Sequence, residues 1–399
     1  MLEGLRILDL TWVLGGPYAG QLLAQLGADV IKVESPSGDP SREIPPYFFD
    51  GDSSFFLSVN RGKQSVVIDL KTPGGLQAFY DLVRESDAVI YGYAPDVPER
   101  LGIDYESLRK INPRICVGAL IGLHDNGAYA RAPAYDLIVQ ALGGIMSITG
   151  SPDRPPARVG YQIADLAGGS FLALGVCAAL AGRSATEGSH VQISLLDCQL
   201  ALLTWQAQNY FISGEVPAAT GSRGPMIAPS EVFRAADGSY LAVSPTGTKF
   251  WTKFCEVIGL PELAEDPRFA TRLDRLQNVE ALAQILSERI SARTSEEWLE
   301  RFAEQRVPVA PVLNVEQALR QPLAQFRDMT ETVVNPSTEN TAEFLGNPFK
   351  YTTSKPLPYP PQCGEDTADV LRSVCKYTDT RIDELSADGS IGVPHDATV

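Results

Sequence analysis

Histidine is scarce in this sequence, which has only His124, His190 and His395 among its 399 residues. A Ser-His-Asp hydrolase would need one of them, yet His395 lies in the C-terminal tail and the other two have no suggestive neighbours. The patterns H-E-x-x-H and G-x-S-x-G are both absent, so zinc peptidases and α/β-hydrolases have no support. We therefore expect the chemistry of this chain to rest on carboxylates.

Cysteine pairs and phosphate-binding loops are missing as well. The six cysteines are spread along the chain and none forms C-x-x-C, which predicts reduced thiols in a cytoplasm rather than a zinc site or a disulfide framework. No G-x-G-x-x-G follows a predicted strand and no Walker A sequence occurs, so dinucleotide and nucleoside triphosphate sites have no support. We expect no metal and no permanently bound cofactor.

Positive charge is in deficit, because the net charge is -16 and the pI is about 4.7. Such a chain repels phosphate backbones and anionic lipid, so neither nucleic acid nor membrane is an expected partner. The first residues include Glu3, Arg6 and Asp9, where a signal peptide needs an apolar stretch. The longest apolar run, 171–182, is shorter than a bilayer span. These features predict a cytoplasmic protein.

What the sequence does have is an alternation of strand and helix patterns over its first 214 residues. That alternation predicts an α/β fold whose large domain holds an open, mainly parallel, Rossmann-like sheet. A Gly/Pro/Ser-rich linker at 215–225 leads to a smaller α+β domain at 226–325, and 326–399 returns to the large domain, with a mobile end at 387–399. The expected strands are 5–10, 29–34, 65–70, 88–91, 115–121 and 191–194, and the expected helices are 18–26, 73–85, 98–112, 133–146, 163–182 and 195–211.

One carboxylate stands out, because Asp165 lies near the start of the apolar helix expected at 163–182. The positive end of the helix dipole predicts that this carboxylate stays ionised. Ala167, Gly168 and Gly169 would let a ligand approach the backbone closely. An ionised, accessible carboxylate can be a nucleophile. Aspartate is also a favoured helix cap, and from spacing alone the cap is the more common explanation.

Several basic residues fall in the first hundred positions of this acidic chain. Positive charge near the ends of parallel strands suits an anion such as a nucleotide phosphate. For each residue alone, a solvated surface charge is the more common explanation. The residues are Lys32, Arg42, Arg61, Lys63, Lys71 and Arg100.

An ordered set of short motifs along nearly the whole chain resembles the class III CoA-transferases, a family that includes formyl-CoA transferase and α-methylacyl-CoA racemase. No single motif is decisive, but the ordered set is highly specific. The motifs are 2–11 (LEGLRILDLT), 26–34 (LGADVIKVE), 38–42 (GDPSR), 60–65 (NRGKQS), 69–75 (DLKTPGG), 99–102 (ERLG), 133–136 (PAYD), 165–169 (DLAGG) and 194–197 (SLLD).

The resemblance reverses the interpretation of Asp165, whose position matches the family's catalytic aspartate. It implies that this carboxylate attacks an acyl-CoA, giving a mixed anhydride and then an aspartyl-CoA thioester that passes CoA to an acceptor acid. The implied substrates are acyl-CoA and small carboxylic acids. The family's fold implies an obligate homodimer of two interlocked rings.

The resemblance also implies a pocket for coenzyme A, position by position. The implied contacts are Trp12, Val13, Leu14 and Gly15 in a first segment; Ile68, Leu70 and Lys71 near the adenine; Tyr93, Arg100 and Leu101 beside the phosphates and pantetheine; and Tyr135 and Asp136 near the reacting centre.

The chain departs from the family at a few of these positions. A family arginine is missing at Ser35, so that one phosphate partner is either lost or supplied by Arg42. Gly92 replaces a polar asparagine, which makes Arg100 more important. Formyl-CoA transferase has His and Gln at the positions of Trp12 and Leu14, and their absence here argues against oxalate as the substrate.

Three other functions stay open. A racemase acting on α-methylacyl-CoA needs two acid/base groups, and Tyr135 stands where family racemases have histidine; an unperturbed tyrosine is a poor base near neutral pH. A non-catalytic acyl-CoA-binding protein would bind without exchange, and a thioesterase would need no acceptor.

Arg223, in the stretch 221–224, or Arg158 could hold a second carboxylate, which would favour succinyl-CoA as donor and a dicarboxylic acceptor.

Overall fold

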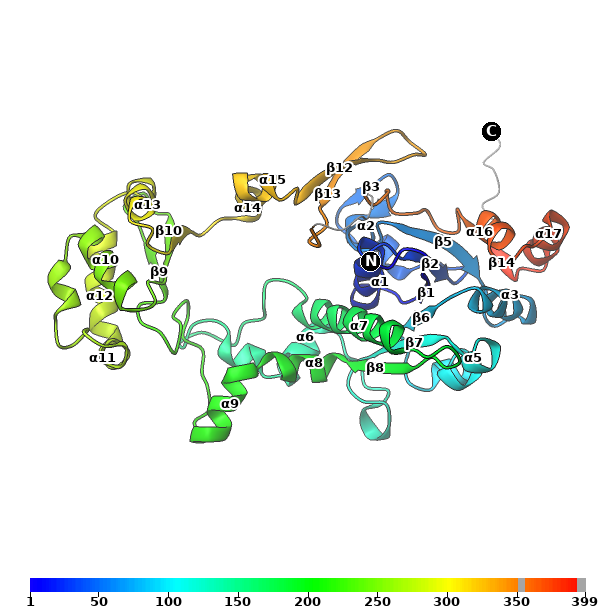
Figure 1. Ribbon diagram of the computed structural model, residues 1–399, viewed down its shortest axis with the longest axis horizontal. Helices are drawn as coiled ribbons and strands as arrows, with labels where there is room; N and C mark the ends of the chain where they lie inside the picture. Colours follow the sequence, from blue (N-terminus) through cyan, green and yellow to red (C-terminus); the bar gives the residue numbers. More distant parts are fainter. Residues whose placement is uncertain (351–355, 393–399) are drawn as a thin grey trace. The chain divides into compact units, whose positions relative to one another are not determined.

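The structure is a computed structural model that describes residues 1–350 and 356–392 (Figure 1). Two compact units account for the chain. One consists of Met1–Ile145, Val159–Asn209 and Gln325–Val399, and the other of Met146–Arg158 and Tyr210–Ala324. The bounds 215–225 for the linker and 226–325 for the small domain stay predictions, and His395 lies outside the described residues.

A seven-stranded sheet organises the first unit, in the order β14-β5-β2-β1-β6-β7-β8. All neighbours pair in parallel except β14, which runs antiparallel to β5. The predicted α/β class and mainly parallel sheet are therefore confirmed. The strands are β1 (Arg6–Leu10), β2 (Asp29–Glu34), β5 (Lys63–Ile68), β6 (Ala88–Tyr91), β7 (Cys116–Ile121), β8 (His190–Ser194) and β14 (Ile391–Gly392).

Helices cover both faces of the sheet, because strand side chains alternate between the two faces. Ile7 and Leu8 are both 0% exposed, yet Ile7 packs in one core cluster and Leu8 in the other. Burying each such side chain is worth roughly 1.5–3 kcal/mol. One face carries α1 (Gly15–Gln25) and α7 (Ile163–Gly182), and the other carries α3 (Pro73–Arg84), α5 (Tyr105–Ile111), α16 (Thr367–Ser373) and α17 (Asp379–Ala387).

The order of the strands places a switch point beside β1. The chain passes from β1 to β2 and β5 on one side, then returns to β6, β7 and β8 on the other. In open α/β sheets, ligands bind outside the carboxyl ends of the strands at such a point. The loops that follow β1 and β6 are thus the first place to look for a site.

Two predicted helices are broken. The helix expected at 98–112 is α4 (Val97–Leu101) and α5, because Gly102 takes a left-handed φ of 72° and ends α4. The helix expected at 195–211 is α8 (Leu195–Leu202) and α9 (Thr204–Ser213), and Thr204 has a φ of 41° at the break. The prediction of a mobile end at 387–399 is wrong for β14, where Ile391 is 3% exposed.

By length and composition, α7 could cross a membrane, since its 20 residues form a strongly apolar helix. The run 171–182 considered in the sequence covers only part of it. One such helix is a weak indication, because a core helix passes the same test. Leu172 and Val176 are 0% and 1% exposed in the cluster with α1, so α7 is a partly buried core helix.

The second unit has an antiparallel three-stranded sheet, in the order β11-β10-β9. Its core is aromatic: Trp251, Phe254, Trp298 and Phe302 are each at most 1% exposed, and neighbouring rings stack. The elements of this unit are β9 (Glu231–Arg234), β10 (Tyr240–Val243), α10 (Thr248–Ile258), α11 (Arg272–Gln277), α12 (Val279–Ile290), α13 (Ser295–Glu304), β11 (Val309–Pro311) and α14 (Val315–Arg320).

Short elements complete the chain. They are the 3-10 turn η1 (Pro40–Glu43), β3 (Phe48–Phe49), β4 (Asp52–Ser53), α2 (Ser54–Ser58), α6 (Asp136–Leu142), α15 (Pro322–Phe326), β12 (Thr330–Val334) and β13 (Thr341–Leu345).

Candidate active site

The loops after β1 and β6 meet across the switch point of the sheet. The indole Nε1 of Trp12 donates a hydrogen bond of 2.8 Å to the carbonyl oxygen of Gly92. Trp12 is otherwise half exposed, at 51%. The bond ties together two loops at the edge of the sheet where this fold class binds its ligands.

The start of α7 touches the first residue of α1, which directly follows the loop after β1. A Cβ added to Gly15 would lie 2.8 Å from the carbonyl oxygen of Asp165, and one added to Gly169 would lie 2.2 Å from the carbonyl oxygen of Gly15. Both distances are far below a normal contact, so only glycine lets the two backbones approach this closely. The first turn of α7, with Asp165, is therefore held beside the loop.

Asp165 is a partly buried carboxyl group in the first turn of α7. Burial, and then the negative charge of Asp136, raise its pKa to about 7. The prediction that Asp165 stays ionised is wrong near neutral pH, because desolvation and the charge of Asp136 raise its pKa. A pKa displaced by burial and by a second carboxylate is typical of functional carboxylates.

Asp136 links α6 to the start of α7 and is 6% exposed. Its Oδ1 accepts from the backbone N–H of Ala164 at 2.9 Å, and its Oδ2 accepts from Gln140 Nε2 at 2.7 Å. Gln140 Oε1 in turn accepts from the N–H of Val159 at 2.9 Å. Asp136 therefore satisfies a free N–H at the start of α7 as a capping side chain would.

The other predicted CoA contacts follow strand ends on the same edge of the sheet, with differing exposure. Tyr135 is 77% exposed and Lys71 is exposed. The Arg100 side chain is 68% exposed and lies 3.7 Å from Asp96. Leu14 and Ile68 are buried, at 6% and 1%, whereas Leu70, Tyr93 and Leu101 are partly buried against the core. Their roles in binding CoA stay predictions.

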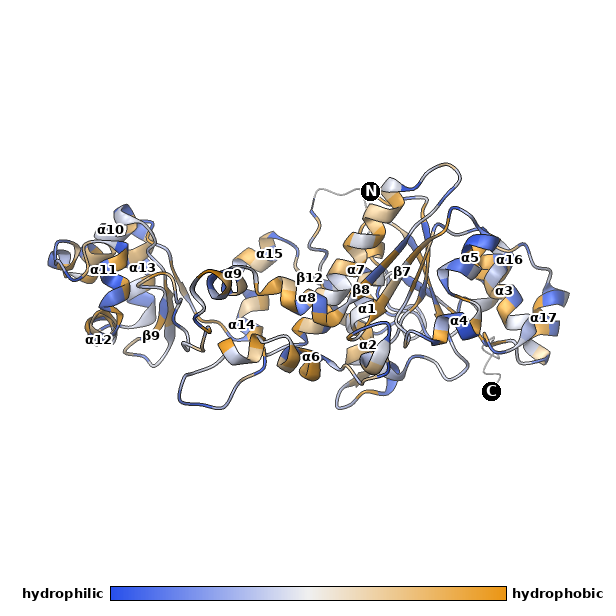
Figure 2. Ribbon diagram, turned by 90° about the horizontal axis from the view of Figure 1, so that it is seen from below, coloured by the Kyte–Doolittle hydropathy of each residue, from blue (hydrophilic) through white to orange (hydrophobic). Residues whose placement is uncertain are grey.

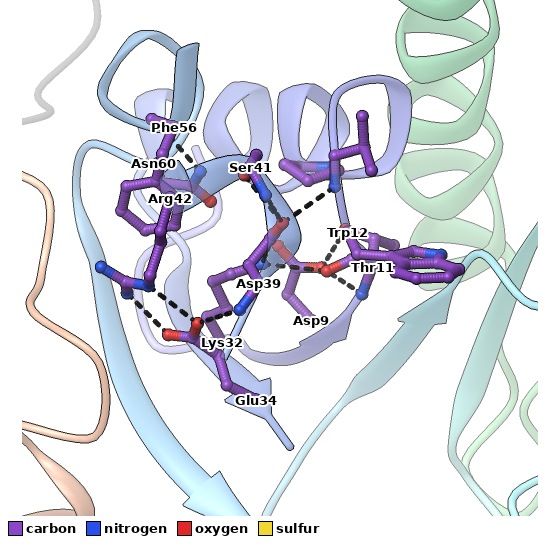
Figure 3. A network of polar contacts seen from close by, with 12 residues as sticks. Asp9, Thr11, Trp12, Lys32, Glu34, Asp39, Ser41, Arg42, Phe56 and Asn60 are labelled. Carbon is purple, nitrogen blue, oxygen red and sulfur yellow. Dashed lines mark hydrogen bonds and ion pairs between the residues drawn. The ribbon is translucent and has the colours of Figure 1, made fainter. Parts of the chain in front are cut away.

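Arg42 belongs to a buried network of charges (Figure 3). Its guanidinium donates to Glu34 at 2.7 Å, to Asp52 at 2.9 Å and to the carbonyl oxygen of Pro361, and it lies 3.7 Å from the centre of the Phe56 ring. Binding a CoA phosphate would compete with these partners. Its predicted role as a phosphate partner remains untested.

Arg223 is not the unpaired cation that the sequence suggested. Its guanidinium pairs with Glu231 at 3.3 Å and with Glu280 at 2.5 Å. Arg158 is exposed, and no ion pair to it occurs among residues 1–350 and 356–392.

Sequence reasoning missed several side chains that shape the site. Gln140 was readable in principle, because it follows Asp136 by four positions on the expected helix. Lys32 was noted only as a basic residue, and Asp39 only as part of the motif 38–42. Their pairing with the loop after β1 depends on tertiary contacts that no sequence spacing shows.

Comparison with known proteins adds an independent result. The family model described as CoA-transferase family III matches residues 2–367. Acetyl-CoA:oxalate CoA-transferase of Acetobacter aceti is 41% identical over 82% of this chain and 84% of its own length. Succinate–glutarate CoA-transferase of Agrobacterium fabrum is 37% identical over 93% and 94%. A CaiB/BaiF family protein from Brucella suis has a solved structure with a TM-score of 0.81 and 34% identity, covering 94% of this chain and 99% of that one.

Proposed function

The chain belongs to CoA-transferase family III, and from this premise we propose that it moves CoA from an acyl-CoA donor to a small dicarboxylic acid through a thioester on Asp165. The observation that carries the proposal is the carboxyl group of Asp165, held at the switch point edge of the sheet with a pKa raised by burial to about 7. A partly desolvated carboxylate is a stronger nucleophile than a solvated one.

The exchange balances without a net proton. An oxygen of Asp165 attacks the thioester carbon, the C–S bond breaks, and a mixed anhydride and the CoA thiolate form. The thiolate then attacks the aspartyl carbonyl carbon, and the bond between that carbon and the bridging anhydride oxygen breaks, so that the donor acid leaves as its carboxylate. The acceptor carboxylate attacks the resulting thioester, and the same two steps in reverse leave acceptor-CoA and a free Asp165 carboxylate. Keeping water out protects the anhydride.

The relatives support a dicarboxylic acceptor. Their names give oxalate in one protein, glutarate in others, and mesaconate with succinyl-CoA in a protein of Haloarcula hispanica that is 37% identical. The absence of His and Gln at the positions of Trp12 and Leu14 no longer argues strongly against oxalate, because the oxalate enzyme of Acetobacter is 41% identical to this chain. We propose succinyl-CoA as donor and a cytoplasmic location.

The direct test is the mass of the peptide that contains Asp165 after incubation with succinyl-CoA and no acceptor. We expect an adduct of CoA on Asp165 that disappears when the acceptor is added. An unmodified peptide with every acyl-CoA donor tried would reject the thioester mechanism. Exchange of the substrate α-proton with deuterated water, without CoA transfer, would point instead to the racemase.

Arg158 gives a test of the acceptor class. Replacing Arg158 by alanine should raise the KM for a dicarboxylic acceptor about tenfold, because one charge-assisted hydrogen bond to the distal carboxylate is lost. Initial rates with succinate or glutarate and with a monocarboxylic acid of equal length measure the effect. Arg154→Ala, in the same loop, is the control. Equal effects on the two acids would reject the role of Arg158.

We also propose that the protein is a homodimer. The neighbouring helices α6 and α8 consist largely of hydrophobic residues (Figure 2), several of which are exposed. Monomers rarely leave contiguous apolar surface of this kind uncovered. The residues are Leu137, Ile138, Leu142, Leu200 and Leu202, which are between 41% and 56% exposed.

The dimer has a simple test. Ile138→Glu together with Leu142→Glu should shift the purified protein from dimer to monomer, because two charges would have to be buried at the interface. Light scattering after size-exclusion chromatography measures the mass. Leu273→Glu, at a 62% exposed position on α11, is the control. A monomeric wild-type protein would overturn the proposal.

A further inference from the structure

The loop after β1 contains a residue in a costly conformation. Val13 has a φ of 67°, in the left-handed region. A β-branched residue pays roughly 1–3 kcal/mol there and stays only when its surroundings hold it. A left-handed valine two residues before Gly15, which contacts the backbone of Asp165, indicates that the position of this loop matters.

Bonds from side chains fix the loop at three successive residues. The N–H of Thr11 donates to Asp9 Oδ1 at 2.9 Å, and the carbonyl oxygen of Thr11 accepts from Lys32 Nζ at 2.9 Å. Trp12 is fixed by its bond to Gly92, described above. The N–H of Val13 donates to Asp39 Oδ1 at 3.2 Å.

The groups that hold the loop form buried ion pairs (Figure 3). Lys32 Nζ lies 2.8 Å from Asp39 Oδ2, and both side chains are 1% exposed. Lys63 Nζ lies 2.8 Å from Asp9 Oδ2, and both are 0% exposed. Burial alone would raise the pKa of Asp39, but the charge of Lys32 and hydrogen bonds from Ser41 lower it to about 2, so the pair is charged at neutral pH.

Stability alone is a poor explanation for the Lys32–Asp39 pair. A buried ion pair costs so much desolvation that apolar residues of similar size often serve the fold equally well. What apolar residues cannot do is donate to the carbonyl oxygen of Thr11 and accept from the N–H of Val13. The pair therefore sets a conformation rather than adding stability.

We propose that Asp39, with Lys32, is a positioning residue for the reaction: it holds Val13 in the left-handed conformation, and through Gly15 it places the loop against the backbone of Asp165. The proposal rests on the proposed function of Asp165 as nucleophile. It adds that the reaction depends on a buried pair that touches no substrate.

The main test is the double variant Asp39→Asn with Lys32→Met, which removes both charges and leaves no unpaired buried ion. We expect a melting temperature within a few degrees of wild type, but a roughly 10- to 100-fold slower formation of aspartyl-CoA in a single turnover at saturating donor, because a misplacement of about 1 Å can cost that much. Hydrogen exchange of the backbone at residues 10–17 should be faster than in wild type.

Two further variants keep the proposal falsifiable. Val13→Gly removes the strain and should fold even if the double variant does not; we expect it also to slow aspartyl-CoA formation without lowering the melting temperature. Glu331→Gln is the control, because it breaks a 2.9 Å ion pair to the 4% exposed Arg61 side chain without contacting the loop. It should lower the melting temperature and leave the rate unchanged.

The results that would overturn the positioning role differ from those that would reject the proposed function. Wild-type rates with unchanged exchange at 10–17 in both Val13→Gly and the double variant would overturn the positioning role. Failure of wild-type protein to form the adduct would reject the proposed function, and faster exchange at 10–17 in the variants alone would then still establish that the pair holds the loop.

Discussion

Asp165→Ala should abolish CoA transfer, lowering kcat on the order of 10⁴-fold or more, because no thioester can form without the nucleophile. Asp165 is the carboxylate that the fold brings to the switch point edge with a raised pKa. Steady-state transfer from succinyl-CoA to a dicarboxylic acid measures the loss. Calorimetry should show that the variant still binds CoA, because the proposed contacts to CoA lie elsewhere.

A second readout separates the role of Asp165 from damage to the fold. Its folded pKa of about 7 lies above the unfolded value of 3.8, so its contribution to stability is full below the unfolded pKa and is lost as the pH rises through 7. Asp165→Ala should therefore melt at a higher temperature than wild type at pH 8, and this gain should shrink as the pH falls toward 4. Asp197→Ala, in the first turn of α8, should show neither effect. Substantial residual transfer by a pure Asp165→Ala protein would exclude the nucleophilic role.

The sequence predicted well those helices and strands that depend on the pattern of neighbouring residues. The apolar-rich segments 5–10 and 29–34 correctly predicted β1 and β2, and Gly27, with a φ of 102°, follows the end of helix α1 between them as expected. Gly102 was an equally readable break that the helix expected at 98–112 overlooked. The break at Thr204 has no glycine or proline to announce it. β14 was missed because it has only two residues, and only their pairing with β5, far away in sequence, makes them a strand.

Electrostatics explains most errors at the site. Asp165 was expected to be ionised because the effect of the helix dipole can be predicted from the local sequence. Burial, by contrast, depends on tertiary packing, and the charge of Asp136 comes from a residue 29 positions away. The partners of Arg223 likewise include Glu280, 57 positions along the chain. A sequence lists charges, but which of them meet is decided by packing. The order of the motifs, by contrast, singled out Asp165 without any of this knowledge, and its catalytic role stays a prediction.

Asp136→Asn should move the pH dependence of the reaction to lower pH. In wild type, kcat/KM for the donor should rise with pH up to about 7 and then level off, because the nucleophile must be ionised in the free enzyme. At pH 6 about a tenth of the plateau should remain. Removing the negative charge of Asp136 removes the second cause of the raised pKa of Asp165. The acidic side of the pH profile should therefore move to lower pH. It should not move as far as the ordinary pKa of aspartate, because burial, the larger cause, remains.

The position of that acidic side, the acid limb of the profile, is informative even if the variant is slower. An asparagine at 136 can still accept from the N–H of Ala164, but its amide would face Gln140 Nε2, so Gln140 must turn and the N–H of Val159 loses its acceptor. The plateau can therefore fall while the limb moves to lower pH. Asp197→Asn removes a charge at the start of a neighbouring helix and should leave the limb in place. If the acidic side of the pH profile of Asp136→Asn stayed at its wild-type pH or moved to higher pH, the charge of Asp136 would not raise the pKa of Asp165. Burial alone would then account for the pKa of Asp165.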